Sequence, residues 1–420
     1  MRRMICFALV ICCPLLQAQN DNCVEMSITE AENIFMMNNF QLLAEHYEID
    51  KADAAIVQSK LFDNPVVSFE QNVYNRLNGK YFDFGSKGQS AVEIEQLIYI
   101  AGQRSNKIKL EKYNRKRNEY LFEESVRILK NELKLKFVSL YYRLKEIDIY
   151  DSEIKSLQNL LTRIKQEEEK GNISLLERTR IEAYLLSLES ERNDVANDIV
   201  SLRGNVKLLI GGKCASEISP VINESLLNDF DMGSVPYSEL EGFVMERPDM
   251  KLAKVNIQSA ETEIELQRSL SFPEVRIKGV YDKAGNFIND YFAVGINLTL
   301  PVFNRNQGNI RIAKHSLAQN RIMEEHSYMN AMNELCNSYK RLENAVDLYD
   351  KTDKDIELNM EKLTKGLNES LIAKNISIIE FIDFYEAYKN TSLNTYKIRK
   401  DVFMAMEDIN YITNHNVFRY

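Results

Sequence analysis

The amino-acid sequence predicts a mainly α-helical protein with a small β part, built from two copies of one unit. Three observations support this prediction. Helix-breaking residues are scarce, apolar side chains recur with a seven-residue period, and short alternating segments return at the same places in both halves. The 420 residues include only 15 glycines and 7 prolines. Scarce breakers favour long helices and exclude a many-stranded sandwich or a collagen-like chain.

Composition and charge narrow the class of protein further. Apolar residues make up 45% and charged residues 27% of the chain, which is typical of a folded rather than a disordered protein. There are 62 acidic and 53 basic residues, a formal net charge of −9. This acidic balance argues against nucleic acid as a partner. No stretch after the N-terminal segment holds 18 consecutive apolar residues, so we expect no membrane-spanning helix.

The N-terminal segment has the pattern of a secretory signal peptide over residues 1–18. Arg2 and Arg3 precede an apolar run over 4–16, and the small residue Ala18 is followed by polar residues. This order is typical of an export signal, and the run is too short to cross a bilayer. A buried N-terminal helix is the alternative. Loss of Arg2 and Arg3 with the signal takes the net charge from −9 to −11.

Export to an oxidising compartment would permit disulfide bonds. Three cysteines remain after the signal, namely Cys23, Cys214 and Cys336. Cys23 and Cys214 lie just outside the helical pattern, whereas Cys336 lies within it. A Cys23–Cys214 bridge is therefore one interpretation, and three unpaired thiols is the other.

The chain after the signal is an internal duplication. At an offset of 208 residues, Ile49, Ala52, Asp53, Ile56 and Pro65 align with Ile257, Ala260, Glu261, Ile264 and Pro273. The offset falls to 204 and then 203 further along, and the order of features is preserved. We therefore predict a first repeat over 19–238 and a second repeat over 239–420.

Each repeat is predicted to contain a helix, a β-hairpin and a long helical hairpin. The first repeat has a helix over 27–62, a β-hairpin over 65–100 with strands at 65–74 and 90–100, a helical hairpin over 103–209 with helices at 103–169 and 173–209, and an equatorial segment over 210–238. The second repeat has a helix over 239–270, a β-hairpin over 273–301 with strands at 273–282 and 291–301, and a helical hairpin over 305–412 with helices at 305–366 and 372–412.

The helical prediction rests on apolar heptads. From Phe122 to Ile147, apolar side chains recur at steps of three and four residues, which predicts a seam buried against another helix. A helix over 103–169 would be ~100 Å long at 1.5 Å per residue. The two shorter helices of the first repeat, laid end to end, match that length. Each repeat is therefore expected to form two parallel rods, one continuous and one broken.

The predicted strands alternate apolar and polar residues. In the last strand, Phe292, Val294 and Ile296 alternate with Ala293 and Gly295. About ten residues is the length of a tilted strand that crosses a bilayer, and this alternation with aromatic ends is the pattern of a transmembrane barrel. A two-faced sheet packed on the helices is the equally supported alternative. Four strands cannot close a barrel, so the membrane interpretation requires several chains.

Together these features resemble the TolC family of outer membrane efflux proteins, over nearly the whole chain after the signal. The resemblance rests locally on Glu246-Arg247-Pro248, on the prolines Pro65 and Pro273 before the strands, on the segments 100–104 and 300–304 after them, and on the turns at 171–174 and 375–377. The details look most like the cation-efflux (CzcC/CusC) branch. The chain departs from the family pattern in lacking Arg-Pro in the first repeat. It also has Lys374 where the first repeat has Gly171.

The resemblance implies a homotrimer with a twelve-stranded barrel in the outer membrane and an α-helical tunnel in the periplasm. Such proteins are passive exit ducts that work with a periplasmic adaptor protein and an inner-membrane efflux pump, and they have no cofactor. Heavy-metal cations are the substrate that the cation-efflux branch implies, with drugs or proteins as alternatives.

The resemblance also gives individual residues roles. Glu380 and Asp383 match the family's paired acidic gate positions, and a solvated acidic face is the alternative. The helix turns farthest from the membrane would dock the adaptor. Charged residues on the inner strand face would line the lumen. The docking residues are Gly171, Asn172, Ile173, Ser174, Asn375, Ile376 and Ser377, and the lumen residues are Glu70, Glu93, Glu95, Arg276 and Lys278.

The sequence offers no catalytic constellation, so we expect no enzyme. None of its four histidines has a partner at metal-ligand spacing, and there is neither a phosphate loop nor a nucleophile elbow. The main alternative to the duct is a periplasmic or secreted coiled-coil adaptor or structural protein without a transmembrane barrel.

Overall fold

The computed structural model describes residues 23–212, 217–228, 230–284, 288–352 and 356–420. The predicted signal peptide over 1–18 lies outside the described residues. So does Cys214, and the Cys23–Cys214 bridge therefore stays a prediction. Cys336 carries a free thiol.

The first repeat has the predicted order of elements, with one extra break. It contains helices α1 (Ile28–Asn38), α2 (Phe40–Lys60), α3 (Gln103–Glu169) and α4 (Leu175–Leu209), strands β2 (Val66–Gln71) and β5 (Ser90–Ile98), and a small hairpin of β3 (Tyr74–Asn75) and β4 (Lys80–Tyr81) between them. The prediction of one helix over 27–62 is wrong. Asn39 caps α2 by accepting from the Leu42 N–H, and its Nδ2 donates to the Leu209 carbonyl at 2.8 Å, which holds the break in place.

The second repeat has the same order. It contains helices α5 (Tyr237–Val244), α6 (Pro248–Ser269), α7 (Gln307–Lys351), α8 (Ile356–Ile372) and α9 (Ile378–Thr413), and strands β7 (Glu274–Ala284) and β8 (Asn289–Thr299).

Three predicted helices of the second repeat need correction. The helix over 239–270 is divided into α5 and α6, because Pro248 has no N–H and is tolerated only at the start of a helix. The continuous helix over 305–366 is wrong, since α7 ends where Thr352 turns extended (φ −76°, ψ 127°). The last helix begins at Ile378, not at 372, because Ser377 caps it.

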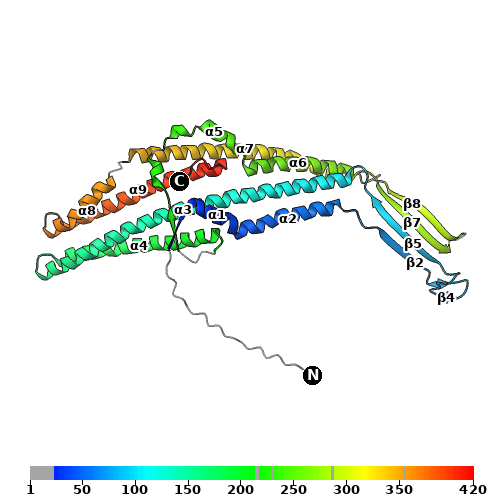
Figure 1. Ribbon diagram of the computed structural model, residues 1–420, viewed down its shortest axis with the longest axis horizontal. Coiled ribbons are helices and arrows are strands. Elements are labelled where there is room, and N and C mark those ends of the chain that lie inside the picture. The colour runs from blue at the N-terminus through cyan, green and yellow to red at the C-terminus, as the bar shows by residue number, and fades with distance from the viewer. Residues whose placement is uncertain (1–22, 213–216, 229, 285–287, 353–355) are drawn as a thin grey trace, which may run out of the picture.

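The described parts of the equatorial segment lie beside the helical rod, between the helix turns and the sheet (Figure 1). Its strand β6 (Glu217–Val221) pairs in parallel with β1 (Cys23–Ser27), which joins the two ends of the first repeat. Two short 3-10 helices, η1 (Glu224–Leu227) and η2 (Met232–Ser234), follow.

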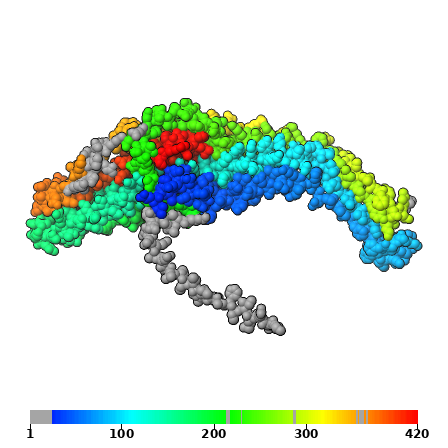
Figure 2. All heavy atoms as spheres, in the orientation of Figure 1, coloured from blue at the N-terminus to red at the C-terminus, as the bar shows by residue number. Residues whose placement is uncertain are grey.

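The helices form a long, gently arched rod with the sheet beyond one end and the helix turns at the other (Figures 1 and 2). Helices α2 and α4 pack along different parts of α3, and α6 and α9 pack along α7. The predicted pairing of a continuous helix with a broken one therefore holds for the first repeat, whereas in the second repeat both partners are broken.

The predicted heptad seam is confirmed as core. Leu133, Phe137 and Leu140 of α3 are fully buried, and Leu129 is buried as well. Ile181, Leu188 and Val206 of α4 are buried against the same seam. Each such side chain contributes about 1.5–3 kcal/mol through removal from water.

Candidate functional site

The sheet has one polar and one apolar face. Its strands pair antiparallel in the order β2-β5-β7-β8, and the register fixes which residues share a face. Side chains alternate across a strand, so partners in the register point the same way. The polar face carries Ser68, Glu70, Glu93, Glu95, Glu274, Arg276, Lys278, Asp282 and Asn297, and the apolar face carries Val67, Phe69, Val92, Ile94, Val275, Ile277, Phe292, Val294, Ile296 and Leu298.

Four of the five predicted lumen residues meet as two ion pairs across β5 and β7. Arg276 donates to Glu95 at 2.9 Å, and Lys278 donates to Glu93 at 3.1 Å. The fifth, Glu70, is exposed on the edge strand β2 and lies opposite Ala91 in the register. The predicted lumen residues are acidic in the first repeat and basic in the second. Their pairing inside one chain follows from the strand order.

The apolar face is not covered by the helices, because the sheet projects past the end of the rod (Figures 1 and 2). Phe292 is 75% exposed and Val294 is 83% exposed. The alternative of a sheet packed on the helices is therefore wrong. In water alone, so large an uncovered apolar surface would be unfavourable, and such surfaces mark contact with another protein or with lipid.

The sheet and the row of helices next to it each end in two outer elements, and each outer element has a neighbour on one side only. Strands β2 and β8 are the edges of the sheet. In the half of the rod next to the sheet, packing follows the row α2, α3, α6, α7, so α2 and α7 are the outer helices. Both present apolar side chains to solvent at heptad spacing. These are Phe40, Leu43, Tyr47 and Val57 on α2, and Ile312, Ile322 and Met329 on α7.

The two predicted docking turns lie together at the end of the rod away from the sheet (Figure 1). Ser174 and Ser377 cap α4 and α9, each within a reciprocal capping box. Asn172 is anchored by its Nδ2 atom, which donates to Glu167 at 2.7 Å, whereas Asn375 is exposed. Ile173 and Ile376 are partly buried against the core. The turns therefore present mainly polar surface.

Gly171 and Lys374 occupy equivalent left-handed positions, with φ of 78° and 59°. A residue with a Cβ atom is disfavoured there by about 1–2 kcal/mol. We therefore expect Lys374→Gly to raise the free energy of unfolding of the second turn by up to ~1 kcal/mol, and Gly171→Ala to lower that of the first by ~1 kcal/mol. Denaturant titrations of both variants check this. Shifts of the same sign would contradict it.

The structure gives Glu380 a local role that the sequence analysis missed. Its carboxylate accepts from the Ser377 backbone N–H at 2.8 Å, as that of Glu177 does from Ser174 at 2.7 Å in the first repeat. This hydrogen bond lowers the pKa of Glu380 below its ordinary value. Asp383, the second predicted gate residue, is exposed one turn further along α9. Glu380 therefore combines a capping role with its exposed position.

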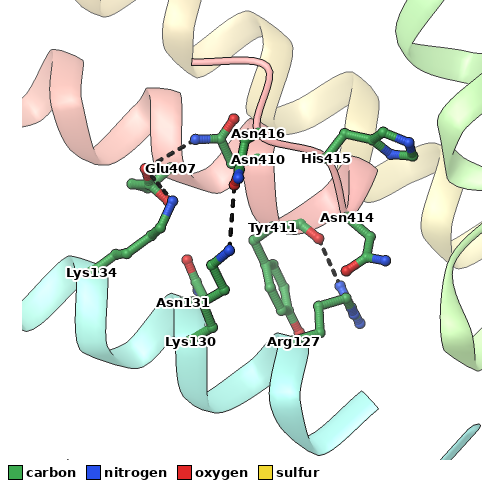
Figure 3. A pocket seen from close by; sticks show the side chains of 10 residues that line it. All are labelled: Arg127, Lys130, Asn131, Lys134, Glu407, Asn410, Tyr411, Asn414, His415 and Asn416. Atoms are coloured by element: carbon green, nitrogen blue, oxygen red, sulfur yellow. Dashed lines mark hydrogen bonds and ion pairs between the residues drawn. The ribbon is translucent and has the colours of Figure 1, made fainter. Parts of the chain in front are cut away.

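A small polar cavity lies where α3 meets the end of α9 (Figure 3). Lys134 pairs with Glu407 at 3.1 Å and with Glu32 at 3.0 Å. Arg127 pairs with Glu124 at 2.6 Å and donates to the Tyr411 carbonyl at 2.9 Å. Burial raises the pKa of Glu407, and its nearest cation, Lys134, opposes that shift.

The cavity belongs to the packing between α3 and α9 and does not have the properties of a ligand site. Its volume is about 50 Å³, enough for a water molecule or two. Both cations named above are already neutralised by carboxylates, so the cavity does not favour an anion. The sequence analysis missed it because Lys134 and Glu407 are 273 residues apart.

Within the described part of the chain, no three His, Cys, Asp or Glu side chains are grouped so that they could hold a metal ion. In the same part of the chain, no helix is both long and apolar enough to cross a membrane.

Comparison with known proteins identifies the fold. Residues 244–352 match the family of outer membrane efflux proteins. The chain is similar in structure to the Campylobacter jejuni CmeC outer membrane channel, with a TM-score of 0.76 and 14% identity over 92% of this chain and 85% of that one. The chain has the fold of the outer membrane efflux channels.

Two further solved structures support this fold. CusC, described for its transmembrane channel formation, aligns with a TM-score of 0.75 and 14% identity over 92% of this chain and 91% of that one. The outer membrane protein VceC from Vibrio cholerae aligns with a TM-score of 0.71 and 12% identity over 92% of this chain and 96% of that one. No curated protein matches the sequence. The scores for CusC and CmeC do not separate the cation-efflux branch from the rest.

Proposed function

We propose that this protein is the outer membrane exit duct of a tripartite efflux system, closed by three copies of the chain. The observation that carries the proposal is the sheet. It combines an uncovered apolar face, an ion-paired polar face and two free edges. An open edge is not tolerated in lipid, so a sheet of this kind is complete only when its edges are joined.

The apolar face suits contact with lipid. Strands β7 and β8 have 11 residues each, the length of a tilted strand across the hydrocarbon core. Apolar side chains outward and polar side chains inward is the arrangement of a membrane barrel around water. A periplasmic adaptor without a barrel would leave this face in water.

The free edges suit a ring of copies. Strand β2 of one copy would pair with β8 of the next, and α2 would pack on α7 of the next. Because the two edges differ, this contact is head-to-tail and closes only as a ring. With three copies, the number that the sequence resemblance implies for a homotrimer, the four strands of each chain would make a twelve-stranded barrel.

The polar face would then line a water-filled lumen. It carries five carboxylates (Glu70, Glu93, Glu95, Glu274 and Asp282) and two basic side chains (Arg276 and Lys278), an excess of three negative charges per copy. An acidic lumen favours cations. This excess of negative charge supports metal cations as the transported class. In this proposal the duct conducts them outward passively.

Neutralising the paired carboxylates is expected to weaken the cation preference. Glu93→Gln with Glu95→Gln removes two of the three excess negative charges, takes Glu93 from Lys278, and leaves Arg276 with Glu274 at 3.6 Å. In planar bilayers, the reversal potential across a potassium chloride gradient should shift toward zero. Glu45→Gln, a charge-neutralising change at a half-buried position on α2 away from the sheet, is the control and should change nothing. Equal reversal potentials for all three proteins would contradict an acidic lumen.

The helix turns would meet the periplasmic adaptor, with the inner-membrane pump beyond it. The capped ends of α4 and α9 hold these turns in fixed positions, which suits docking of another helical hairpin. Near them, Asp383 of each copy would contribute to an acidic ring at the entrance, with Glu380 at its rim. Divalent cations added to planar-bilayer recordings should reduce the current by binding this ring. Asp383→Asn should weaken that block.

A further inference from the structure

Glu153 is a buried carboxylate with no hydrogen-bond partner. It lies on α3, close to α4 and α9, and is 3% exposed. Among the described residues, neither of its oxygens has a hydrogen-bond partner. Buried polar groups are nearly always paired, and an ionised carboxylate without partners in an interior is strongly unfavourable.

Among the described residues, the cation that acts on Glu153 is Lys389, and it is already engaged. Lys389 of α9 is buried and pairs with Glu191 of α4 at 2.8 Å. Glu191 also accepts from the Tyr150 hydroxyl at 3.2 Å and from the Ser187 hydroxyl at 3.3 Å. Two carboxylates therefore share one lysine, and Glu191 holds it.

The remaining groups around Glu153 do not stabilise a charge there. Tyr184 of α4 is buried, and its hydroxyl has no hydrogen-bond partner among the described residues. Glu386 of α9 acts as a negative charge on the same Tyr184, and Glu146 of α3 is paired with Arg143 at 2.5 Å. Tyr385 of α9 is directed to neutral partners, since its hydroxyl bonds Ser156 and Asn368.

We infer that Glu153 is a proton-binding site that couples the packing of α9 against α3 and α4 to pH. With its proton, Glu153 is a neutral side chain that fits an apolar junction. Without it, the carboxylate either takes Lys389 from Glu191 or reaches water, and each requires α9 to move relative to α3 and α4.

The direction of the titration agrees with this geometry. Burial raises the pKa of Glu153 to about 8, which Lys389 opposes and Glu191 reinforces. The folded protein therefore holds this proton more tightly than the unfolded chain, whose glutamates titrate near ~4.3. The stabilisation is complete below that value and is lost as the pH rises through about 8.

A single tryptophan gives the test a clean signal, because the chain contains none. Phe384→Trp places it on α9, at a half-buried position next in sequence to the buried Tyr385. In the full-length protein in detergent, its fluorescence should titrate between pH 6 and 9.5 with a midpoint near 8. Adding Glu153→Gln, which mimics the protonated form, should abolish this transition, whereas Glu189→Gln on the exposed face of α4 should preserve it.

Changes to the partners distinguish this site from other groups that titrate in that range. Glu191→Gln frees Lys389 for Glu153, so the midpoint should fall by a pH unit or more. Lys389→Met should raise it. A transition that persists unchanged in Glu153→Gln, or a flat response in the parent, would overturn the proposal. If Glu153→Gln does not fold, an unmoved midpoint in Glu191→Gln would do so.

The readout is helix packing and not transport, so this inference stands or fails independently of the proposed duct.

Discussion

Arginine at Val294 is expected to remove the protein from the outer membrane, whereas arginine at the next residue, Ala293, is expected to leave it there. The two positions share one depth at the middle of β8 and differ in face. Val294 is on the uncovered apolar face, and Ala293 pairs with Val280 on the polar face.

The expected size follows from the cost of a charge facing lipid. Arginine near the bilayer midplane costs ~2–4 kcal/mol per strand, and a ring of three copies repeats that cost three times. Density-gradient fractionation of cells producing each variant measures the effect. Circular dichroism should show unchanged helix content in both, since the sheet projects past the end of the helical rod (Figure 1). Equal membrane recovery of the two variants would contradict a lipid-facing apolar face.

Charge on the exposed stripe of α2 is expected to dissociate the ring. Leu43→Glu with Tyr47→Glu places two charges where α7 of the next copy would pack. Each buried apolar side chain at such a contact is worth ~1.5–3 kcal/mol, and every ring contains the contact three times. The variant should therefore run as a single chain in detergent by light scattering.

The control for this prediction is Glu48→Lys. Glu48 is also exposed on α2, but it lies off the stripe and pairs with Lys51 at 2.5 Å. Its assembly should match that of the unmodified protein. Dissociation by both changes would indicate a general loss of folding, and dissociation by neither would contradict the α2–α7 contact.

The sequence predicts the long elements well, because their signals are local. The bounds of α3 match the prediction of 103–169, because Gly102 and Gly171, both at positive φ, interrupt the helical backbone at its two ends. The strands fall within a few residues of their predicted ranges because alternation is a local pattern. The break at Asn39 escaped prediction, since the apolar pattern continues through it and only the cap to Leu42 reveals it.

The site is less predictable because its contacts are non-local. Opposite charges on the two hairpins are visible in the sequence, but the pairs Arg276–Glu95 and Lys278–Glu93 depend on strand order and register. Glu153 shows the same limit. A heptad marks the face of α3 that meets one partner, whereas α3 packs against both α4 and α9, and the second face has no separate pattern.

The central claim is that one chain supplies only part of a membrane channel. The most direct test is the mass of the purified full-length protein in detergent together with its conductance in a planar bilayer. The proposed function predicts an assembly of three chains, extracted only by detergent, that opens stable conductance steps. A single chain that is soluble without detergent and conducts no current would contradict it.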